Sequence, residues 1–290
     1  MDNALIFWGM TTAVENLRNF DAYVTRCLNQ TVANMVKLEV KGQVEQQSAG
    51  AGEMNTKRND NQDNVDEQWE VQPVTSNTLN DEHFWDSYVS SWENSENKSK
   101  YEFLGNEWKH EEKFLEMLKK YSSAHMDALE IGCGGGRITS FAAPLFRNVF
   151  ATDISNNMLQ KCSNSVTASN VSYTKTDGFT LDGFSSSSVD LVFSHDVFVH
   201  ISALQVYPYL IEIRRVLGDG GIAIISFFNY EKHLALFKEY SLAYHNAKSI
   251  PPHMRVHFVT EQIIRLMLDD LGLSVVETDN SFYLIFVVRK

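Results

Sequence analysis

Cysteine is scarce in this chain, and long apolar runs are missing from it. The three cysteines, Cys27, Cys133 and Cys162, are widely separated, so we expect neither a disulfide framework nor a metal site. No stretch approaches the roughly 20 apolar residues of a membrane span, and the first residues lack the basic segment of a secretory signal. We therefore expect a cytoplasmic protein that does not enter membranes.

Positive charge is also in short supply. The chain has 25 Lys and Arg against 37 Asp and Glu, which gives a net charge of −12. Proteins that bind nucleic acids normally present a basic face, so the balance disfavours such a partner. Hydrophobic residues make up 43% of the 290 residues, which is enough for one large domain and an appendage.

The N-terminal part of the chain differs in composition from the rest. Residues 45–80 are polar, contain several glycines and have few aliphatic side chains, which predicts a flexible linker. Residues 1–44 are predicted to form a helical arm, with an amphipathic helix over 11–44. Its apolar positions follow a heptad pattern at Leu17, Val24, Leu28, Met35 and Leu38. Asp21 and Thr31 interrupt the pattern, so two interpretations stay open: a coiled coil that makes a homo-oligomer, and a surface helix folded onto the domain.

Residues 81–290 alternate between short apolar runs and helical patterns. Strands are predicted over 127–131, 148–152, 171–175, 189–194, 222–228, 274–278 and 282–288. Helices are predicted from Asn80 onward and over 107–121, 138–144, 156–168, 204–216 and 260–271.

This alternation is typical of an α/β domain with helices on both faces of a mostly parallel sheet. The last two predicted strands have a hairpin-sized connection, so the final strand should run antiparallel at the end of the sheet. The fold prediction is a doubly wound, mostly parallel seven-stranded sheet of Rossmann-like type with a terminal antiparallel strand.

A glycine-rich turn is the most informative local feature. The segment 128–137 reads ALEIGCGGGR, and Gly132, Gly134 and Gly136 remove side chains from a predicted strand-to-helix turn, so that a ligand can lie on bare backbone. Arg137 stands where a dinucleotide-binding fingerprint needs a further glycine. Asp153 is expected at the end of the second strand, where a carboxylate can accept both hydroxyls of a ribose.

Together, these elements resemble the first two motifs of the class I S-adenosylmethionine-dependent methyltransferases. The sequences TDGF (176–179), VDLVFS (189–194) and RRVLGDGGI (214–222) also resemble later motifs of that family. The resemblance covers residues 81–290, is to the small-molecule type of the family, and implies S-adenosylmethionine as cofactor and a small-molecule substrate. It implies cofactor contacts at Glu130, Gly132, Cys133, Gly134, Gly136, Asp153, Ile154, Met158, Asp177, Gly178, Phe179 and Ser194.

Several of these positions also have plainer interpretations. Glu130 can simply orient the glycine loop, and Asp177 can cap a turn. Cys133 is better explained by packing than by a reactive thiol.

The segment after the fourth predicted strand offers acid–base chemistry. A hydroxyl acceptor needs a general base, and SHDVFVHI (194–201) contains His195, Asp196 and His200. We predict His195 and His200 as the catalytic residues, while His200 has a second interpretation as a structural residue before the next helix.

An insert at about 229–259 is rich in aromatic and histidine residues, and in the family this connection commonly covers the acceptor. The leading functional hypothesis is O-methylation of a saccharide or glycan precursor. The alternatives are methylation of a natural-product phenol or amine, and a cofactor-binding regulatory or scaffold protein without catalysis.

Overall fold

The computed structural model describes residues 77–100, 102–106, 110–247 and 256–290. The described residues all belong to one compact unit. The helical arm predicted at 1–44 lies outside the described residues. So does the predicted linker at 45–80, except for its last four residues, 77–80.

The predicted helices have counterparts in the structure, with shifted ends. The helix predicted from Asn80 begins three residues earlier, and the one predicted over 138–144 continues as a 3-10 turn. The helices are α2 (Asn77–Glu93), α3 (Asn97–Lys100), α4 (Glu112–Tyr121), α5 (Arg137–Ala142), η1 (Ala143–Leu145), α6 (Asn156–Ser165), α7 (Ala203–Val216), α8 (Leu234–Ala247) and α9 (Glu261–Asp270).

Side-chain caps explain where three of these helices begin. The Ser155 hydroxyl accepts a hydrogen bond from the backbone N–H of Met158 at the start of α6, and Thr260 caps α9 in the same way. At the start of α7, Ser202 and Gln205 form a capping box. Each cap satisfies N–H groups that have no partner within the helix. Within the described part of the chain, no helix is long and apolar enough to cross a membrane.

The strands form one sheet in the order β3-β2-β1-β4-β5-β8-β7, with a short β6 beside β5. They are β1 (Asp127–Ile131), β2 (Asn148–Asp153), β3 (Val171–Lys175), β4 (Val189–Ser194), β5 (Leu217–Asn229), β6 (Phe258–Val259), β7 (Ser274–Asn280) and β8 (Tyr283–Arg289). All pairings among β1 to β5 are parallel, whereas β8 pairs antiparallel with both β5 and β7. The predicted fold is therefore confirmed, but the final strand does not lie at the end of the sheet: β8 pairs between β5 and β7, and β7 forms the edge.

Two details of the sheet differ from the prediction. β5 begins at Leu217 instead of residue 222, because Leu217 pairs with Val189 across an irregularity in the ladder. The parallel strand β6 was missed, since two residues are too few to show any periodicity.

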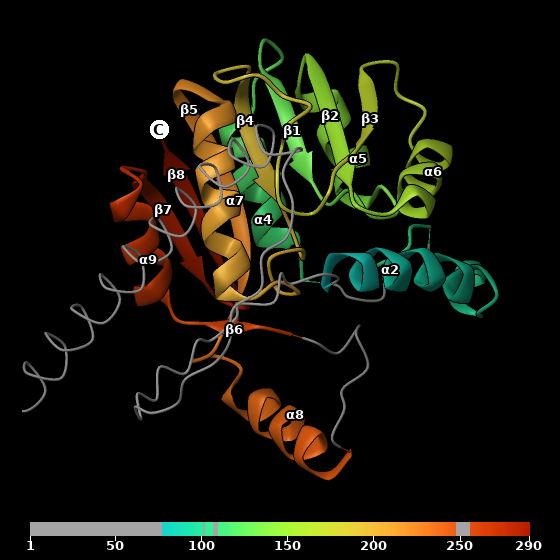
Figure 1. Cartoon of the computed structure of the whole chain (residues 1–290). Helices are drawn as coiled ribbons and strands as arrows, with labels where there is room; N and C mark the ends of the chain where they lie inside the picture. The colour runs from blue at the N-terminus through green and yellow to red at the C-terminus, as the bar shows by residue number, and fades with distance from the viewer. Residues whose placement is uncertain (1–76, 101, 107–109, 248–255) are drawn as a thin grey trace, which may run out of the picture. The chain divides into compact units, whose positions relative to one another are not determined.

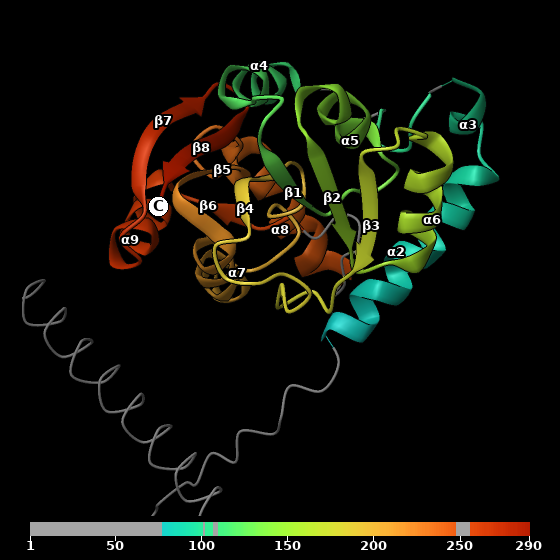
Figure 2. The same ribbon diagram turned by 90° about the horizontal axis from the view of Figure 1, so that it is seen from above.

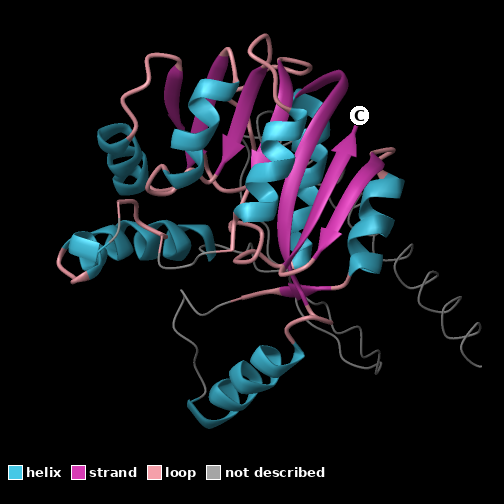
Figure 3. Ribbon diagram, turned by 180° about the vertical axis from the view of Figure 1, so that it is seen from behind, coloured by secondary structure: helices cyan, strands magenta, loops and turns pink. Residues whose placement is uncertain are grey.

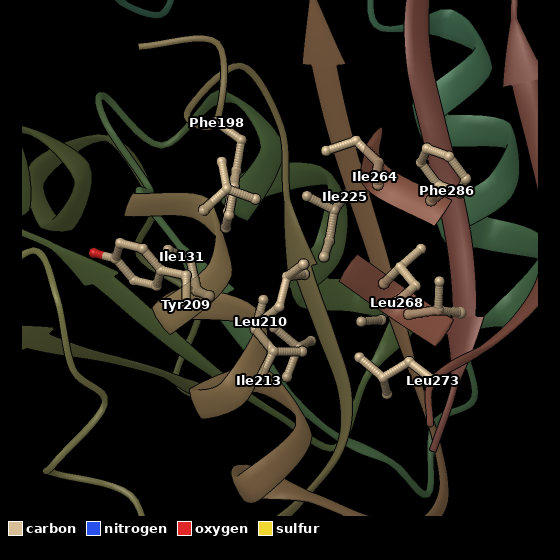
Figure 4. Packing of buried hydrophobic residues seen from close by; sticks show 14 of the residues in the cluster. Ile131, Phe198, Tyr209, Leu210, Ile213, Ile225, Ile264, Leu268, Leu273 and Phe286 are labelled. Atoms are coloured by element: carbon tan, nitrogen blue, oxygen red, sulfur yellow. The ribbon is translucent and has the colours of Figure 1, made fainter. Parts of the chain in front are cut away.

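Helices cover both faces of the sheet, α4 and α5 on one and α7 and α9 on the other (Figure 2). Alternate residues of β8 pack on opposite faces of the sheet. Leu284 and Phe286 belong to the buried cluster under α7 and α9, and Ile285 and Val287 to the cluster under α4 and α5. Figure 4 shows part of the first cluster. Such a run of apolar residues is expected of a strand that is buried on both faces.

The parallel strands end at a common edge, and this edge positions the site. α2, β6 and α8 lie beyond the carboxyl ends of these strands (Figures 1 and 3). In open α/β sheets, ligands bind outside the carboxyl ends of the strands, near the point where strand order reverses. Here the order reverses between β1 and β4.

Candidate active site

A cavity of about 520 Å³ opens at the carboxyl ends of the central strands. Its first half is lined by the glycine loop after β1, the end of β2, the turn after β3 and two aromatic residues of α2. We call this part the glycine-loop half. The second half is lined by the end of β5, the insert that contains α8, and the turn into β8. We call this part the aromatic half.

The three loop glycines are required for three different reasons. Gly132 has φ +75°, and a Cβ there would lie 2.3 Å from Cγ2 of Val197. Gly136 has φ +95° and packs against Val166, which a Cβ would approach to 2.9 Å. Gly134 has φ +52°, but a Cβ there would meet nothing within 4 Å. Because Gly134 lines the cavity, that open space belongs to the site, and a ligand there can reach bare backbone.

Asp153, the last residue of β2, lines the cavity and is tied to the loop. Its Oδ2 accepts a hydrogen bond from the N–H of Gly134 at 2.9 Å, and its Oδ1 accepts one from the N–H of Ser155 at 2.9 Å. Burial raises the pKa of this carboxyl to about 6. The side chain is therefore fixed in orientation and mainly ionised at neutral pH.

Glu130 and Cys133 also line the cavity. The hydroxyl of Thr139 donates a hydrogen bond to Glu130 at 2.6 Å, and burial raises the pKa of Glu130 to about 8. Contact with the Cys162 thiol, together with burial, raises the pKa of the Cys133 thiol. A protonated, buried thiol is a poor nucleophile, so the structure agrees with a packing role for Cys133.

Two residues of α2 complete the glycine-loop half, and sequence reasoning did not single them out. Trp85 and Tyr88 line the cavity with Met158 of α6 and Ile154. Asp86 anchors α2 by accepting hydrogen bonds from the hydroxyl of Ser155 and the N–H of Asn157. The run of aromatic residues after Asn80 was visible in the sequence, but its position over the site was not.

Four predicted cofactor residues do not line the cavity: Gly136, Asp177, Phe179 and Ser194. Asp177 accepts hydrogen bonds from the N–H groups of Phe179 and Thr180. Burial acts to raise the pKa of its carboxyl, but these hydrogen bonds outweigh burial, and the pKa lies below its usual range. Phe179 is 40% exposed. The Ser194 hydroxyl donates to the carbonyl of Ile131 and so ties β4 to β1. The neighbours of Asp177, Thr176 and Gly178, do line the cavity.

Both predicted catalytic histidines line the cavity, in different surroundings. His195 is 6% exposed, and neither ring nitrogen has a hydrogen-bond partner among the described residues. Its ring lies 4.5 Å from that of Phe114 and 4.9 Å from that of Tyr283. Burial, with the positive charge of Arg137, lowers the pKa of His195 to about 3. The ring of His200 lies edge-on to that of Trp85, with the centroids 5.1 Å apart.

The aromatic half collects residues that are distant in the sequence. Phe228 comes from β5, Tyr240 from α8, and Phe282 and Tyr283 from the turn into β8. The ring of His110 stacks on that of Phe282, with the centroids 3.8 Å apart. The insert predicted at 229–259 therefore contributes to the lining of the cavity through α8.

A charged group that sequence reasoning did not assign lies between the halves. Asp196 accepts a hydrogen bond from the hydroxyl of Tyr283 at 2.9 Å. Arg137 lies 2.8 Å from Glu111 and 3.9 Å from Asp196. Arg137 was noticed only as a departure from the dinucleotide pattern, and nothing in the sequence connected Tyr283 with the site.

Among the described residues, no three His, Cys, Asp or Glu side chains gather closely enough to hold a metal ion. The cavity thus combines the exposed backbone of the glycine loop and the oriented carboxylate of Asp153 with aromatic side chains and ionisable groups.

Comparison with known proteins agrees with this geometry. The methyltransferase domain family model matches residues 129–225, which include the glycine loop, Asp153 and β4. Among curated proteins, none matches the chain significantly.

Solved structures share the fold at low sequence identity. A chain of the complex between the Haloferax volcanii Trm112 methyltransferase activator and a methyltransferase is 18% identical, with a TM-score of 0.55, and the match covers 71% of this chain and 96% of that one. The PH0226 protein from Pyrococcus horikoshii is 23% identical, with a TM-score of 0.51 and coverage of 68% and 92%. An S-adenosylmethionine-dependent methyltransferase from Mesorhizobium loti is 14% identical, with a TM-score of 0.51 and coverage of 62% and 97%. The family match, the fold and the cavity agree: residues 129–225 match the methyltransferase domain family, and the described sheet has a fold that it shares with S-adenosylmethionine-dependent methyltransferases.

Proposed function

We propose that this domain transfers the methyl group of S-adenosylmethionine to a hydroxyl group of a small polar acceptor, with a saccharide or glycan precursor as the leading candidate. The observation that carries the proposal is the continuity of one cavity from the glycine loop to the aromatic wall. A donor and an acceptor held in the two halves would meet beside the carboxyl end of β4. Alignment of two reactants in this way is a large part of what an enzyme contributes to a group transfer.

The glycine-loop half fits the cofactor. The open space beside Gly134 accepts a ligand against bare backbone, and Asp153 presents a carboxylate suited to the ribose hydroxyls. We assign the adenine end to the turn that contains Thr176 and Gly178, with Asp177 holding that turn through its own hydrogen bonds.

The remaining residues of the predicted cofactor set have supporting roles in this proposal. Met158 and Ile154 contribute apolar surface, while Gly136 and Ser194 shape the site from behind. When bound, S-adenosylmethionine supplies an electrophilic methyl group on a positively charged sulfur. The chain then has to align the acceptor and keep water out, and Trp85 and Tyr88 on α2 cover the cofactor side.

The aromatic half suits a ring-shaped acceptor that carries hydroxyl groups. Phe228, Phe282 and Tyr240 offer apolar faces, while Asp196 and Arg137 offer polar partners for hydroxyls. A second candidate, a phenol or an aromatic amine, is favoured by the stacked rings of His110 and Phe282, since a flat ring can extend such a stack. A hydroxyl acceptor also needs a general base, and the segment 194–201 lies at the junction of the two halves.

The proposal is tested in two steps. Calorimetry with S-adenosylmethionine, S-adenosylhomocysteine and NAD measures which cofactor binds; binding of NAD alone would reject the assignment. Tritiated S-adenosylmethionine is then supplied with methyl α-D-glucopyranoside, phenol, benzylamine and fractionated extracts. Label in the glucoside or in a saccharide fraction supports the leading candidate, and label in phenol or benzylamine supports the second. Tight cofactor binding without any labelled product would support a regulatory or scaffold role instead.

The cytoplasmic location stays a prediction, for which subcellular fractionation is the test.

A further inference from the structure

We propose that Asp196 is the residue that accepts the proton of the acceptor hydroxyl, in preference to either neighbouring histidine. This inference rests on the proposed function, because only a hydroxyl acceptor needs such a base. Three features of the structure support it: where Asp196 lies, how its backbone is held, and how its carboxylate is hydrogen-bonded.

Asp196 lies where the two halves of the cavity meet. The next residue, Val197, fills the space beside Gly132, where no Cβ fits, so this segment touches the glycine loop directly. On its other side, Asp196 is hydrogen-bonded to Tyr283, which belongs to the aromatic half. A base for methyl transfer has to stand at this junction, because the acceptor oxygen must be close to the donor and to the base at once.

The backbone of Asp196 is held in a conformation that is uncommon for its residue type. Its φ is +62°, and among the described residues the other non-glycine residue with positive φ is Ser187. The N–H of Asp196 donates a hydrogen bond to the hydroxyl of Ser226 on β5 at 3.0 Å. Aspartate tolerates the left-handed region better than most residues do, but the conformation still costs free energy. Costs of this kind concentrate at functional sites, where they aim a side chain.

The carboxylate is oriented but not fully occupied. Tyr283 donates to Oδ1 at 2.9 Å, whereas Oδ2 has the guanidinium of Arg137 at 3.9 Å, beyond hydrogen-bond distance. Oδ2 therefore retains the capacity to accept a hydrogen bond from an acceptor hydroxyl. Tyr283 and Arg137 together act as positioning residues that hold the carboxylate at the junction.

The groups around Asp196 affect the basicity of its carboxylate in opposite directions. Burial raises the pKa of its carboxyl, and the surrounding donors and cations limit that rise. The titratable and charged groups that face it, from each element packed against it, are Glu111, Arg137, His195, His200 and Tyr283. A carboxyl with a raised pKa is a stronger proton acceptor than an ordinary surface aspartate.

The two histidines are less well placed. His195 has a pKa of about 3 because its ring is buried between Phe114 and Tyr283, so it takes up a proton poorly. The ring of His200 lies against Trp85, on the cofactor side of the cavity. Asp196, by contrast, contacts the aromatic half directly through Tyr283.

The proposed step balances in atoms and electrons. The acceptor oxygen forms a bond to the methyl carbon with one of its electron pairs while the bond from carbon to sulfur breaks, and the sulfur keeps that pair. The O–H bond of the acceptor breaks, and its proton passes to Oδ2 of Asp196. The products are the methyl ether, neutral S-adenosylhomocysteine and a protonated Asp196, which returns its proton to solvent.

The test compares an acceptor that needs a base with one that does not. Phenol and methyl α-D-glucopyranoside are protonated at neutral pH, whereas thiophenol is largely a thiolate. Asp196→Asn keeps the size of the side chain and a residue type that tolerates positive φ. With tritiated S-adenosylmethionine, we expect this variant to lower kcat for the hydroxyl acceptor that the wild-type protein methylates by about 10² or more. Transfer to thiophenol and the calorimetric affinity for S-adenosylhomocysteine should stay within about threefold, a margin far smaller than the expected loss of general-base catalysis.

Controls separate this role from a structural one. Asp219→Asn, in an exposed turn of β5, removes a carboxylate without touching the cavity and should change neither rate. Tyr283→Phe removes a donor to Asp196, which raises the pKa of that carboxyl, so the rise of kcat with pH should move to higher pH. His195→Gln and His200→Gln should each retain more activity toward hydroxyl acceptors than Asp196→Asn does.

Three outcomes would overturn the proposal. Equal losses for hydroxyl and thiolate acceptors would show that Asp196 acts only through structure. Undiminished transfer to the hydroxyl acceptor would show that another group takes the proton. Bound cofactor with no transfer by the wild-type protein to any hydroxyl acceptor, those in the fractionated extracts included, would reject the proposed function, and this inference with it.

Discussion

Gly134 provides a way to disturb the cofactor site while leaving the rest of the fold alone. Its φ of +52° is unfavourable for any residue with a Cβ, yet a Cβ there would meet nothing within 4 Å. Gly134→Ala should therefore lower the free energy of unfolding by only about 1–2 kcal/mol, the cost of left-handed backbone for an L-residue. The added methyl group projects into space that belongs to the cavity, so it should exclude a ligand that rests on the backbone.

The chain contains a matched control for this change. Gly220 has φ +75° and also has nothing within 4 Å of an added Cβ, but it lies in β5 and does not line the cavity. Gly220→Ala should have a similar cost in stability and no effect on binding. Gly134→Ala should weaken S-adenosylhomocysteine binding at least tenfold, which corresponds to about 1.4 kcal/mol.

Calorimetry and urea unfolding of the two variants separate the two contributions. Unchanged affinity in folded Gly134→Ala would refute the placement of the cofactor on this backbone. An equal loss of affinity in Gly220→Ala would show instead that binding follows general stability.

Three further predictions concern the carboxylate, the core and the arm. The pKa of Asp153 is about 6, so wild-type affinity for S-adenosylhomocysteine should rise between about pH 5 and pH 7 as the carboxyl ionises. Calorimetry of Asp153→Asn should show weaker binding that does not change with pH. A rise that persists in the variant would mean that another group titrates. Leu210 is 0% exposed, whereas Leu204 on the same helix is 88% exposed. In urea unfolding, Leu210→Ala should therefore lower the free energy of unfolding by about 2–5 kcal/mol, and Leu204→Ala by less than about 0.5 kcal/mol. Similar losses in the two variants would contradict the burial of this face of α7. If residues 1–44 form a coiled-coil arm, deleting residues 1–75 should reduce the mass seen by light scattering and leave cofactor affinity unchanged, whereas a full-length monomer would rule the coiled coil out.

Much of the sheet was predictable because its signals are local. β1, β3 and β4 have the bounds expected from the sequence, since β1 and β4 are short, largely apolar runs and β3 (VSYTK) alternates between larger and polar side chains. The glycine loop and Asp153 were recognisable for a similar reason, because chain order alone puts them at neighbouring strand ends. Their hydrogen bond, from the N–H of Gly134 to Asp153, spans 19 residues and follows from the pairing of β1 with β2.

In the aromatic half, the insert and the segment 194–201 were expected from the sequence, but the contacts between them and β8 were not, because long-range packing decides those contacts. The hydrogen bond between Tyr283 and Asp196 joins residues 87 positions apart, and it exists because β8 inserts beside β5. Trp85 reaches the cavity from α2, which Asp86 holds against the start of α6. Periodicity indicates that a segment is helical or extended, but it does not indicate which neighbour that segment meets.

Residues with left-handed backbone line both the glycine loop and the junction of the two halves of the cavity. Gly132, Gly134 and Gly178 all have positive φ and all line the cavity, where the absence of a side chain lets the chain turn sharply and leaves room for a ligand. Asp196 has the same kind of backbone and lines the same cavity, but its position needs a side chain, so glycine would be no substitute. The hydrogen bonds from its N–H to Ser226 and from Tyr283 to its carboxylate offset the conformational cost. Hydrogen bonds to β5 and from β8 thus fix both the backbone and the carboxylate of Asp196, at a position between the glycine loop and the aromatic half.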